Sequence, residues 1–203
     1  MEPKKLDFST TLKDAISIGL KNAPSVIAAV ALWLVTLWIP YLNIGTTIAI
    51  TLIPTQLAKG EIVNPMSIFD GKYRRYMGEF FITMGLMVLP ILLGFFFLIA
   101  PAVVLSLAWS LAYYFLIEKG KNPIQAIKAS NDATYGSKWT MFFVSLVFGI
   151  VVGIVMGIFQ AICGAINVGF ITFIVMFVLY VLAISIGMAV NASFWKQLKD
   201  NVE

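Results

Sequence analysis

The chain alternates long apolar segments with short polar ones. Six apolar segments are predicted as helices, at residues 22–39, 44–58, 80–99, 101–117, 139–163 and 168–194. A helix needs roughly 20 residues to cross about 30 Å of hydrocarbon, and most of these segments approach or exceed that length. Segment 44–58 rises only about 22 Å and contains Pro54, so whether it crosses fully is left open. The pattern predicts an all-α integral membrane protein with six transmembrane helices arranged as three helical hairpins.

Charged residues are confined to four segments beside these hairpins. All 14 Lys and Arg residues lie before residue 22, at 59–79, at 118–138 or after residue 195, and the acids fall in the same segments. The connections at 40–43, around Ala100 and at 164–167 carry no charge. Because basic residues collect on the cytoplasmic side, six crossings place all four charged segments and both termini inside. The expected location is the plasma (inner) membrane of a bacterium.

Amphipathic interfacial helices are predicted before each hairpin. Asn64–Pro65 and Asn122–Pro123 each pair an N-cap residue with the proline that suits the first helical position. Two apolar stripes at helical spacing support this interpretation: Phe8, Leu12, Ile16 and Leu20, and Met66, Phe69, Tyr73 and Tyr76. The third helix, after Asn122, has a weaker stripe and is expected to pack on protein. The chain is interpreted as a single membrane domain, 1–203, with hairpin units at approximately 8–58, 64–117 and 122–195.

Composition agrees with a membrane protein. Hydrophobic residues make up 60% of the chain and charged residues 12%, against roughly 45–50% and about 25% in soluble domains. Histidine is absent and Cys163 is the one cysteine, so the sequence offers no thiolate cluster and no nucleophile–base pair. We therefore expect no enzyme, with no catalytic, cofactor-binding or metal-binding residues and no nucleic-acid partner.

Small residues recur every four positions in segment 139–163. This helix-packing stripe consists of Ser145, Gly149, Gly153, Gly157 and Ala161. Such a stripe lets another helix approach closely within a membrane. Ala183 and Gly187 in the last segment offer a complementary surface at the same spacing. The partner is expected to be this neighbouring helix, or else a second copy or a foreign subunit.

Two further groups of residues are candidates for ligand contacts. Lys72, Arg74 and Arg75 lie beside Tyr73 and Tyr76 and could hold an anionic lipid headgroup, or they could serve as ordinary topology determinants.

Ser106 and Ser110 share a helix face with Tyr114. They could line a cavity or could hydrogen-bond to carbonyls of their own helix, and the second interpretation is favoured.

Several short motifs resemble one bacterial family. They are residues 57–61 leading to Ile68 and Phe69, Ala100–Pro101, and residues 126–130 leading to 136–139. The family comprises uncharacterised multi-pass inner-membrane proteins related to the membrane domain of some glycerophosphodiester phosphodiesterases. The resemblance covers roughly residues 10 to 160 and departs at Ala102, where the pattern has glycine. It implies a multi-pass topology and supplies no catalytic residues.

The function expected from these observations is that of a non-catalytic membrane component. It would interact with lipids or form a complex, with membrane lipids, a second copy or another membrane protein as partners. The alternative is a transporter or channel for an apolar or lipid-like solute, which would require an open cavity between hairpins.

Overall fold

A computed structural model describes residues 4–97, 99–166 and 169–202, and all of its regular elements are helical. In chain order they are α1 (Phe8–Thr36), α2 (Leu42–Thr51), α3 (Ile53–Ala58), η1 (Pro65–Phe69), η2 (Tyr73–Tyr76), α4 (Met77–Phe97), α5 (Ile99–Ala108), α6 (Ala112–Glu118), α7 (Pro123–Ala133), α8 (Lys138–Ile166), α9 (Gly169–Leu198) and η3 (Lys199–Asn201). Asn167 and Val168, at the predicted last turn and the start of the last predicted span, lie outside the described residues.

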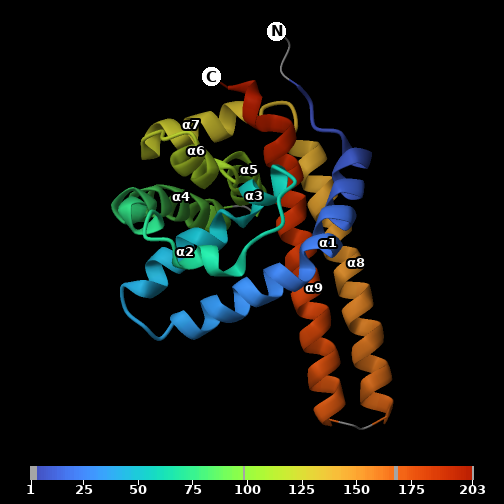
Figure 1. The fold of residues 1–203 in the computed structure, drawn as a ribbon. Helices are drawn as coiled ribbons and strands as arrows, with labels where there is room; N and C mark the ends of the chain where they lie inside the picture. The colour runs from blue at the N-terminus through green and yellow to red at the C-terminus, as the bar shows by residue number, and fades with distance from the viewer. Residues whose placement is uncertain (1–3, 98, 167–168, 203) are drawn as a thin grey trace.

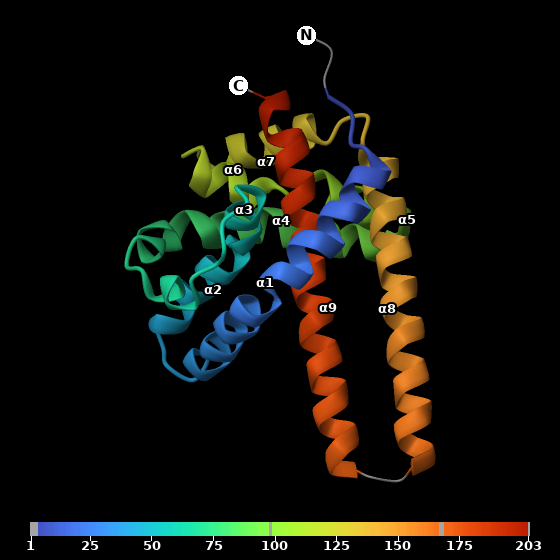
Figure 2. The ribbon, with the colours of Figure 1, turned by 45° about the vertical axis from the view of Figure 1, so that its right-hand side comes forward.

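The long helices α8 and α9 form an antiparallel hairpin that projects from one end of the molecule (Figure 1). The other helices gather beside the half of this hairpin that lies near both chain termini (Figures 1 and 2). Within the described chain, five helical segments are long and apolar enough to cross a membrane: Phe8–Thr36, Tyr73–Phe97, Ile99–Glu118, Lys138–Gly164 and Gly169–Asn201. An apolar, helical, membrane-embedded protein is therefore the class that the fold defines.

Helix α1 combines the predicted N-terminal surface helix and the first predicted span into one helix with a bend (Figure 1). Pro24 lies inside the helix, where its ring removes one hydrogen bond and favours a kink. Asn22 is buried at this bend: its amide donates to the Ile18 carbonyl at 3.1 Å, and its side-chain oxygen accepts from the Val63 amide at 3.2 Å. One side chain thus ties the bend to the segment before η1.

The closest helix contact joins α1 to α9. A Cβ added at Gly19 would lie 2.8 Å from the Ile186 Cα, closer than real Cβ contacts allow. At the same level the Ser185 hydroxyl donates to the Gly19 carbonyl at 2.8 Å. Small residues four apart make the approach possible on both helices, namely Thr11, Ala15, Gly19 and Ala23 on α1 and Ser185, Ala189 and Ser193 on α9.

Polar side chains extend this contact toward the termini. The Gln197 amide nitrogen donates to the Thr11 hydroxyl at 3.0 Å, and its oxygen accepts from the Asp7 amide at 2.9 Å. Nearby, Asp14 forms an ion pair with Lys196 at 3.2 Å. The first helix is thus fixed to the last by hydrogen bonds as well as by packing.

The first hairpin differs from its predicted threading. The sequence pattern places residues 40–43 and the basic segment before α4 on opposite faces of the membrane. In the structure the Arg74 guanidinium lies 5.6 Å from the centre of the Tyr41 ring, and a Cβ added at Gly45 would lie 2.7 Å from the Arg74 Cγ. Because the hydrocarbon core is about 30 Å thick, the prediction that these segments lie on opposite faces is wrong. The charge of the loops alone does not predict that Arg74 packs over the ring of Tyr41, the residue that precedes α2.

The helix predicted to begin at Asn64 is only partly present in the structure. Asn64 caps η1 by accepting from the Met66 amide, but the segment then forms two short 3-10 turns instead of one amphipathic helix. The break is at Asp70, whose carboxylate accepts from the Lys72 amide at 3.0 Å, and the conformationally free Gly71 follows it.

Asn122 starts α7 as predicted, with a full capping box to Gln125. One face of α7, formed by Ala126, Ala129 and Ala133, is buried in the core, so this helix packs on protein as expected.

We predict that a Gly19→Val substitution destabilises the protein by about 1–3 kcal/mol, because the new side chain would overlap the α9 backbone. Gly149→Val is the matched control, since a Cβ there meets nothing within 4 Å. Thermal unfolding in detergent, followed by circular dichroism, measures both. Equal losses of stability in the two variants would contradict the close α1–α9 approach.

Candidate functional site

Groups that could perform chemistry are sparse in the part of the chain that the structure describes. No group of three or more metal-ligating side chains occurs among the described residues. One carboxylate joins α3 to α6: Glu118 accepts from the Thr55 hydroxyl at 3.0 Å and forms an ion pair with Lys59 at 2.9 Å. Both carboxylate oxygens are therefore engaged in a contact that holds the two helices together.

The predicted pair of polar side chains in the fourth segment bonds to backbone carbonyls of α5. Ser106 donates to the Val103 carbonyl and Ser110 to the Leu107 carbonyl, each at 2.9 Å. The favoured interpretation, bonding to backbone carbonyls, is confirmed.

A buried serine that was not predicted from the sequence bonds to backbone groups at a helix break. Ser130 of α7 is fully buried where the predicted fourth span breaks between α5 and α6. Its hydroxyl donates to the Ala108 carbonyl at 2.7 Å and accepts from the Leu111 amide at 3.1 Å. It thereby pairs backbone groups that the break in the helix frees. A buried polar residue on the apolar face of α7 was the available signal.

The small-residue stripe of α8 does not pack against α9. All five of its residues, Ser145, Gly149, Gly153, Gly157 and Ala161, are exposed in the structure. A Cβ added at any of the three glycines would meet nothing within 4 Å. The expectation of intramolecular packing through this stripe is wrong.

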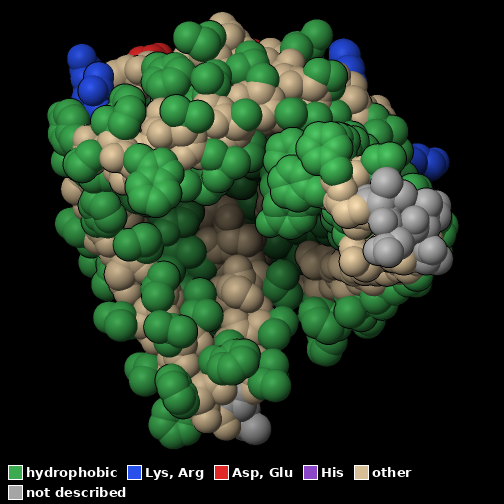
Figure 3. Space-filling view, turned by 90° about the horizontal axis from the view of Figure 1, so that it is seen from below, with side chains coloured by type: hydrophobic (Ala, Val, Ile, Leu, Met, Phe, Trp, Pro, Cys, Tyr) green, Lys and Arg blue, Asp and Glu red, His purple; other side chains and the backbone are tan. Residues whose placement is uncertain are grey.

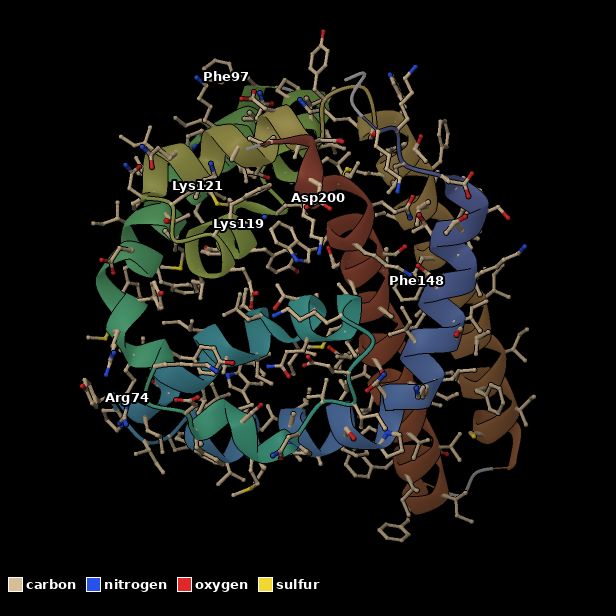
Figure 4. All side chains as sticks on the ribbon, turned by 45° about the horizontal axis from the view of Figure 1, so that its top comes forward. Arg74, Phe97, Lys119, Lys121, Phe148 and Asp200 are labelled. Atoms are coloured by element: carbon tan, nitrogen blue, oxygen red, sulfur yellow. The ribbon has the colours of Figure 1, made fainter. Side chains whose placement is uncertain are left out.

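The opposite side of α8 contacts α9 through a large side chain. A Cβ added at Gly187 would lie 3.4 Å from the Phe148 ring, which is labelled in Figure 4. A phenylalanine therefore occupies the space at the predicted Ala183–Gly187 surface and holds α8 away from α9 there.

The predicted basic cluster is largely engaged within the chain. Lys72 forms an ion pair with Asp70 at 3.1 Å. Hydrogen bonds from the Lys72 backbone and side chain hold the pKa of the Asp70 carboxyl below its usual value, and the bond to Asp70 raises the pKa of Lys72. Arg74 lies at the edge of the molecule over Tyr41 (Figure 4), and Arg75 is exposed.

An apolar groove of about 360 Å³ lies between the first turns of α1 and the α8–α9 hairpin. Every side chain that lines it is apolar; among them are Leu12, Ile16, Leu20, Val152, Met156 and Ala183. The N-terminal stripe predicted to lie on the membrane surface therefore forms one wall of a groove.

A second groove, of about 590 Å³, lies between α5 and the start of α8. Figure 2 shows these two elements side by side near the end of the molecule that carries the termini. Its floor is formed by Val103, Val104 and Leu107, and Trp139 and Lys138 lie on its α8 side. Seen from the hairpin end, the molecule is hollowed and covered with hydrophobic side chains, and Lys and Arg appear only at its edge (Figure 3).

Comparison of the chain with protein families, with curated proteins and with solved structures found no match. The two grooves and the exposed face of α8 are the features of the molecule that could bind a ligand or a partner.

We predict that a Ser130→Ala substitution lowers stability by about 1–3 kcal/mol, because it leaves the buried Leu111 amide without its partner and removes the shorter of two hydrogen bonds to the Ala108 carbonyl. Ser106→Ala is the control, since Ser106 is exposed and bonds only within its own helix. Unfolding in detergent compares the two variants. A neutral Ser130→Ala would show that this hydroxyl does not stabilise the α5–α6 break.

Proposed function

We propose that this protein is a non-catalytic, multi-pass membrane component that holds lipid acyl chains in grooves along its α8 helix. The observation that carries the proposal is the pair of apolar grooves on either side of α8, of about 360 and 590 Å³. Both volumes fall within the range of small-molecule sites. An empty apolar groove facing hydrocarbon forfeits dispersion contacts, so lipid chains are its natural occupants.

The proposed setting is a bacterial plasma membrane, with both termini on the cytoplasmic side and the tip of the α8–α9 hairpin directed outward. The distribution of charge supports this orientation, because Lys4 and Lys5 precede α1, and Lys196 and Lys199 lie in the last turn of α9 and just after it, while the hairpin tip is uncharged. The exposed Arg75 would contact anionic headgroups at the edge of the molecule.

A transporter for an apolar solute has less support than a lipid-holding component. Ser106 and Ser110, the polar residues that would line its path, direct their hydroxyls to carbonyls of α5 and its C-terminal end. The carboxylate of Glu118 is likewise engaged by Thr55 and Lys59. These contacts favour structural roles for the polar groups within the apolar segments.

We predict that protein extracted gently from its own membrane retains phospholipid in native mass spectrometry. Val152→Trp should reduce the retained lipid several-fold, because the indole would fill the groove between α1, α8 and α9. Ile154→Trp adds the same ring on an exposed face of α8 outside both grooves and should have no effect. Equal retention by wild type and Val152→Trp would contradict occupation of this groove.

The exposed small-residue face of α8 supports a second function, assembly with another copy of the chain. Three consecutive glycines of the stripe carry no intramolecular contact, so a facing helix could approach along them. Because the same stripe would face itself across a two-fold axis, it suits a symmetric dimer of the chain.

We predict that Gly153→Ile abolishes a dimer seen in native mass spectrometry while leaving the monomer folded, because only an intermolecular contact is blocked. Gly85→Ile on α4 is the control, since Gly85 also lacks a neighbour within 4 Å. A dimer that survives Gly153→Ile would place the assembly surface elsewhere.

A further inference from the structure

One of the two grooves carries a lysine that forms no ion pair with any residue the structure describes. Lys138 lies in the first turn of α8, is half-buried, and lines the α5–α8 groove. Its ammonium donates to the Asn131 side-chain oxygen at 2.8 Å. The ion pairs among the described residues join Lys59 to Glu118, Lys72 to Asp70 and Lys196 to Asp14, so none of them neutralises Lys138.

The surroundings of Lys138 favour an anion. The end of α8 supplies positive potential, and no acid among the described residues forms an ion pair with the ammonium. The first turn of α8 contains no acidic residue, and this helix end carries the positive end of a 29-residue helix dipole. Asp132 is the neighbouring acid: its carboxylate lies 3.5 Å from the Asn131 amide and forms no ion pair with Lys138 in the part of the chain described here. A partly buried ammonium in an apolar wall is costly unless an anion pairs with it.

The rest of the groove has the character of a membrane–water interface. Trp139 and Tyr135 lie at its rim and are 75% and 72% exposed, as aromatic side chains at headgroup level commonly are. The Trp139 ring stacks on Phe143 with centroids 6.1 Å apart, which fixes its orientation. Below the rim, the apolar face of α5 from Ile99 to Leu107 runs for roughly 12 Å, enough to accompany part of an acyl chain.

We propose that the α5–α8 groove is a binding site for an anionic phospholipid, with one acyl chain on α5 and the phosphate at the Lys138 ammonium. This inference rests on the proposed lipid-holding function and specifies the class of lipid and its headgroup contact. A packed helix from another protein suits the groove less well, because it would bury Lys138 against apolar side chains and leave its charge unpaired. Free phosphate would use the cation but leave the apolar floor empty.

The test measures lipid binding to the full chain in detergent by native mass spectrometry, with phosphatidylglycerol and phosphatidylcholine of identical acyl chains. Wild type should prefer phosphatidylglycerol by about fivefold, the effect of one well-placed basic residue. Lys138→Gln should remove this preference and retain the binding of phosphatidylcholine, whereas Lys138→Arg should keep the preference. Val103→Trp, which fills the floor, should weaken binding of both lipids.

Matched control variants distinguish effects at the groove from general effects of lost charge or added side-chain volume. Lys128→Gln removes an exposed lysine of α7 outside the groove and should leave the preference unchanged. Ile154→Trp adds bulk outside the groove and should leave both affinities unchanged. Circular dichroism and size-exclusion profiles identify any variant that fails to fold, and Lys138→Arg then decides the role of the charge.

Three results would overturn the inference: equal binding of the two lipids by wild type, equal loss of preference in Lys128→Gln and Lys138→Gln, or unchanged binding in folded Val103→Trp. Binding of inorganic phosphate that competes with phosphatidylglycerol without regard to the acyl chain would also overturn it in favour of an anion site. In each case the proposed function stands if Val152→Trp still lowers lipid retention. It fails together with the inference only if neither groove-filling variant changes the retained lipid.

Discussion

The close approach of α1 to α9 at Gly19 is the contact on which the arrangement of the other helices depends. Within a membrane, helices gain little from hydrophobic burial against each other, so close van der Waals contact and hydrogen bonds must hold them. The Ser185–Gly19 hydrogen bond and the absence of a Cβ at Gly19 supply both in one place. Helix α9 then offers its other faces to α3 and α6, where Trp195 packs edge-on against Phe115 with ring centroids 4.9 Å apart. The first and last helices thus form the support for the shorter ones between them.

A second constraint acts wherever an apolar helix bends or breaks. Free backbone groups are costly in a low-dielectric environment, and the structure pairs them with single polar side chains from elsewhere in the chain. Ser130 does this at the α5–α6 break, and Asn22, which lies at the α1 bend, accepts from the Val63 amide of the segment before η1. Two buried polar side chains thus bond to irregular backbone, whereas others, such as Ser185 and Gln197, lie in regular helix and hold α9 to α1.

The sequence predicted the helical class of the fold and some of its helix starts. The length of the apolar segments indicated an all-helical membrane protein, and the Asn122–Pro123 start of α7 is present with its capping box. Which faces meet could not be predicted, because small residues four apart occur on both α1 and α8. The glycines of α8 form the more regular stripe, yet the structure uses the mixed stripe of α1, where Ser185 adds a hydrogen bond to the close contact. Helical spacing specifies a face and not its partner.

The same limit explains why the candidate site in the structure differs from the basic cluster predicted from the sequence. Lys72, Arg74 and Arg75 form the densest basic cluster in the sequence, but Asp70 neutralises Lys72 and the Tyr41 ring holds Arg74. Lys138 is isolated in sequence, and only the fold shows that it lines an apolar groove, where no acid among the described residues forms an ion pair with it. The capacity of a lysine to bind a ligand depends on whether the protein already supplies its anion, and that depends on contacts between segments far apart in the chain. In this protein the unpaired cation and the apolar floor come from α8 and α5, and their combination at one edge of the bundle favours an amphiphile with a negative headgroup over a purely apolar or purely ionic ligand.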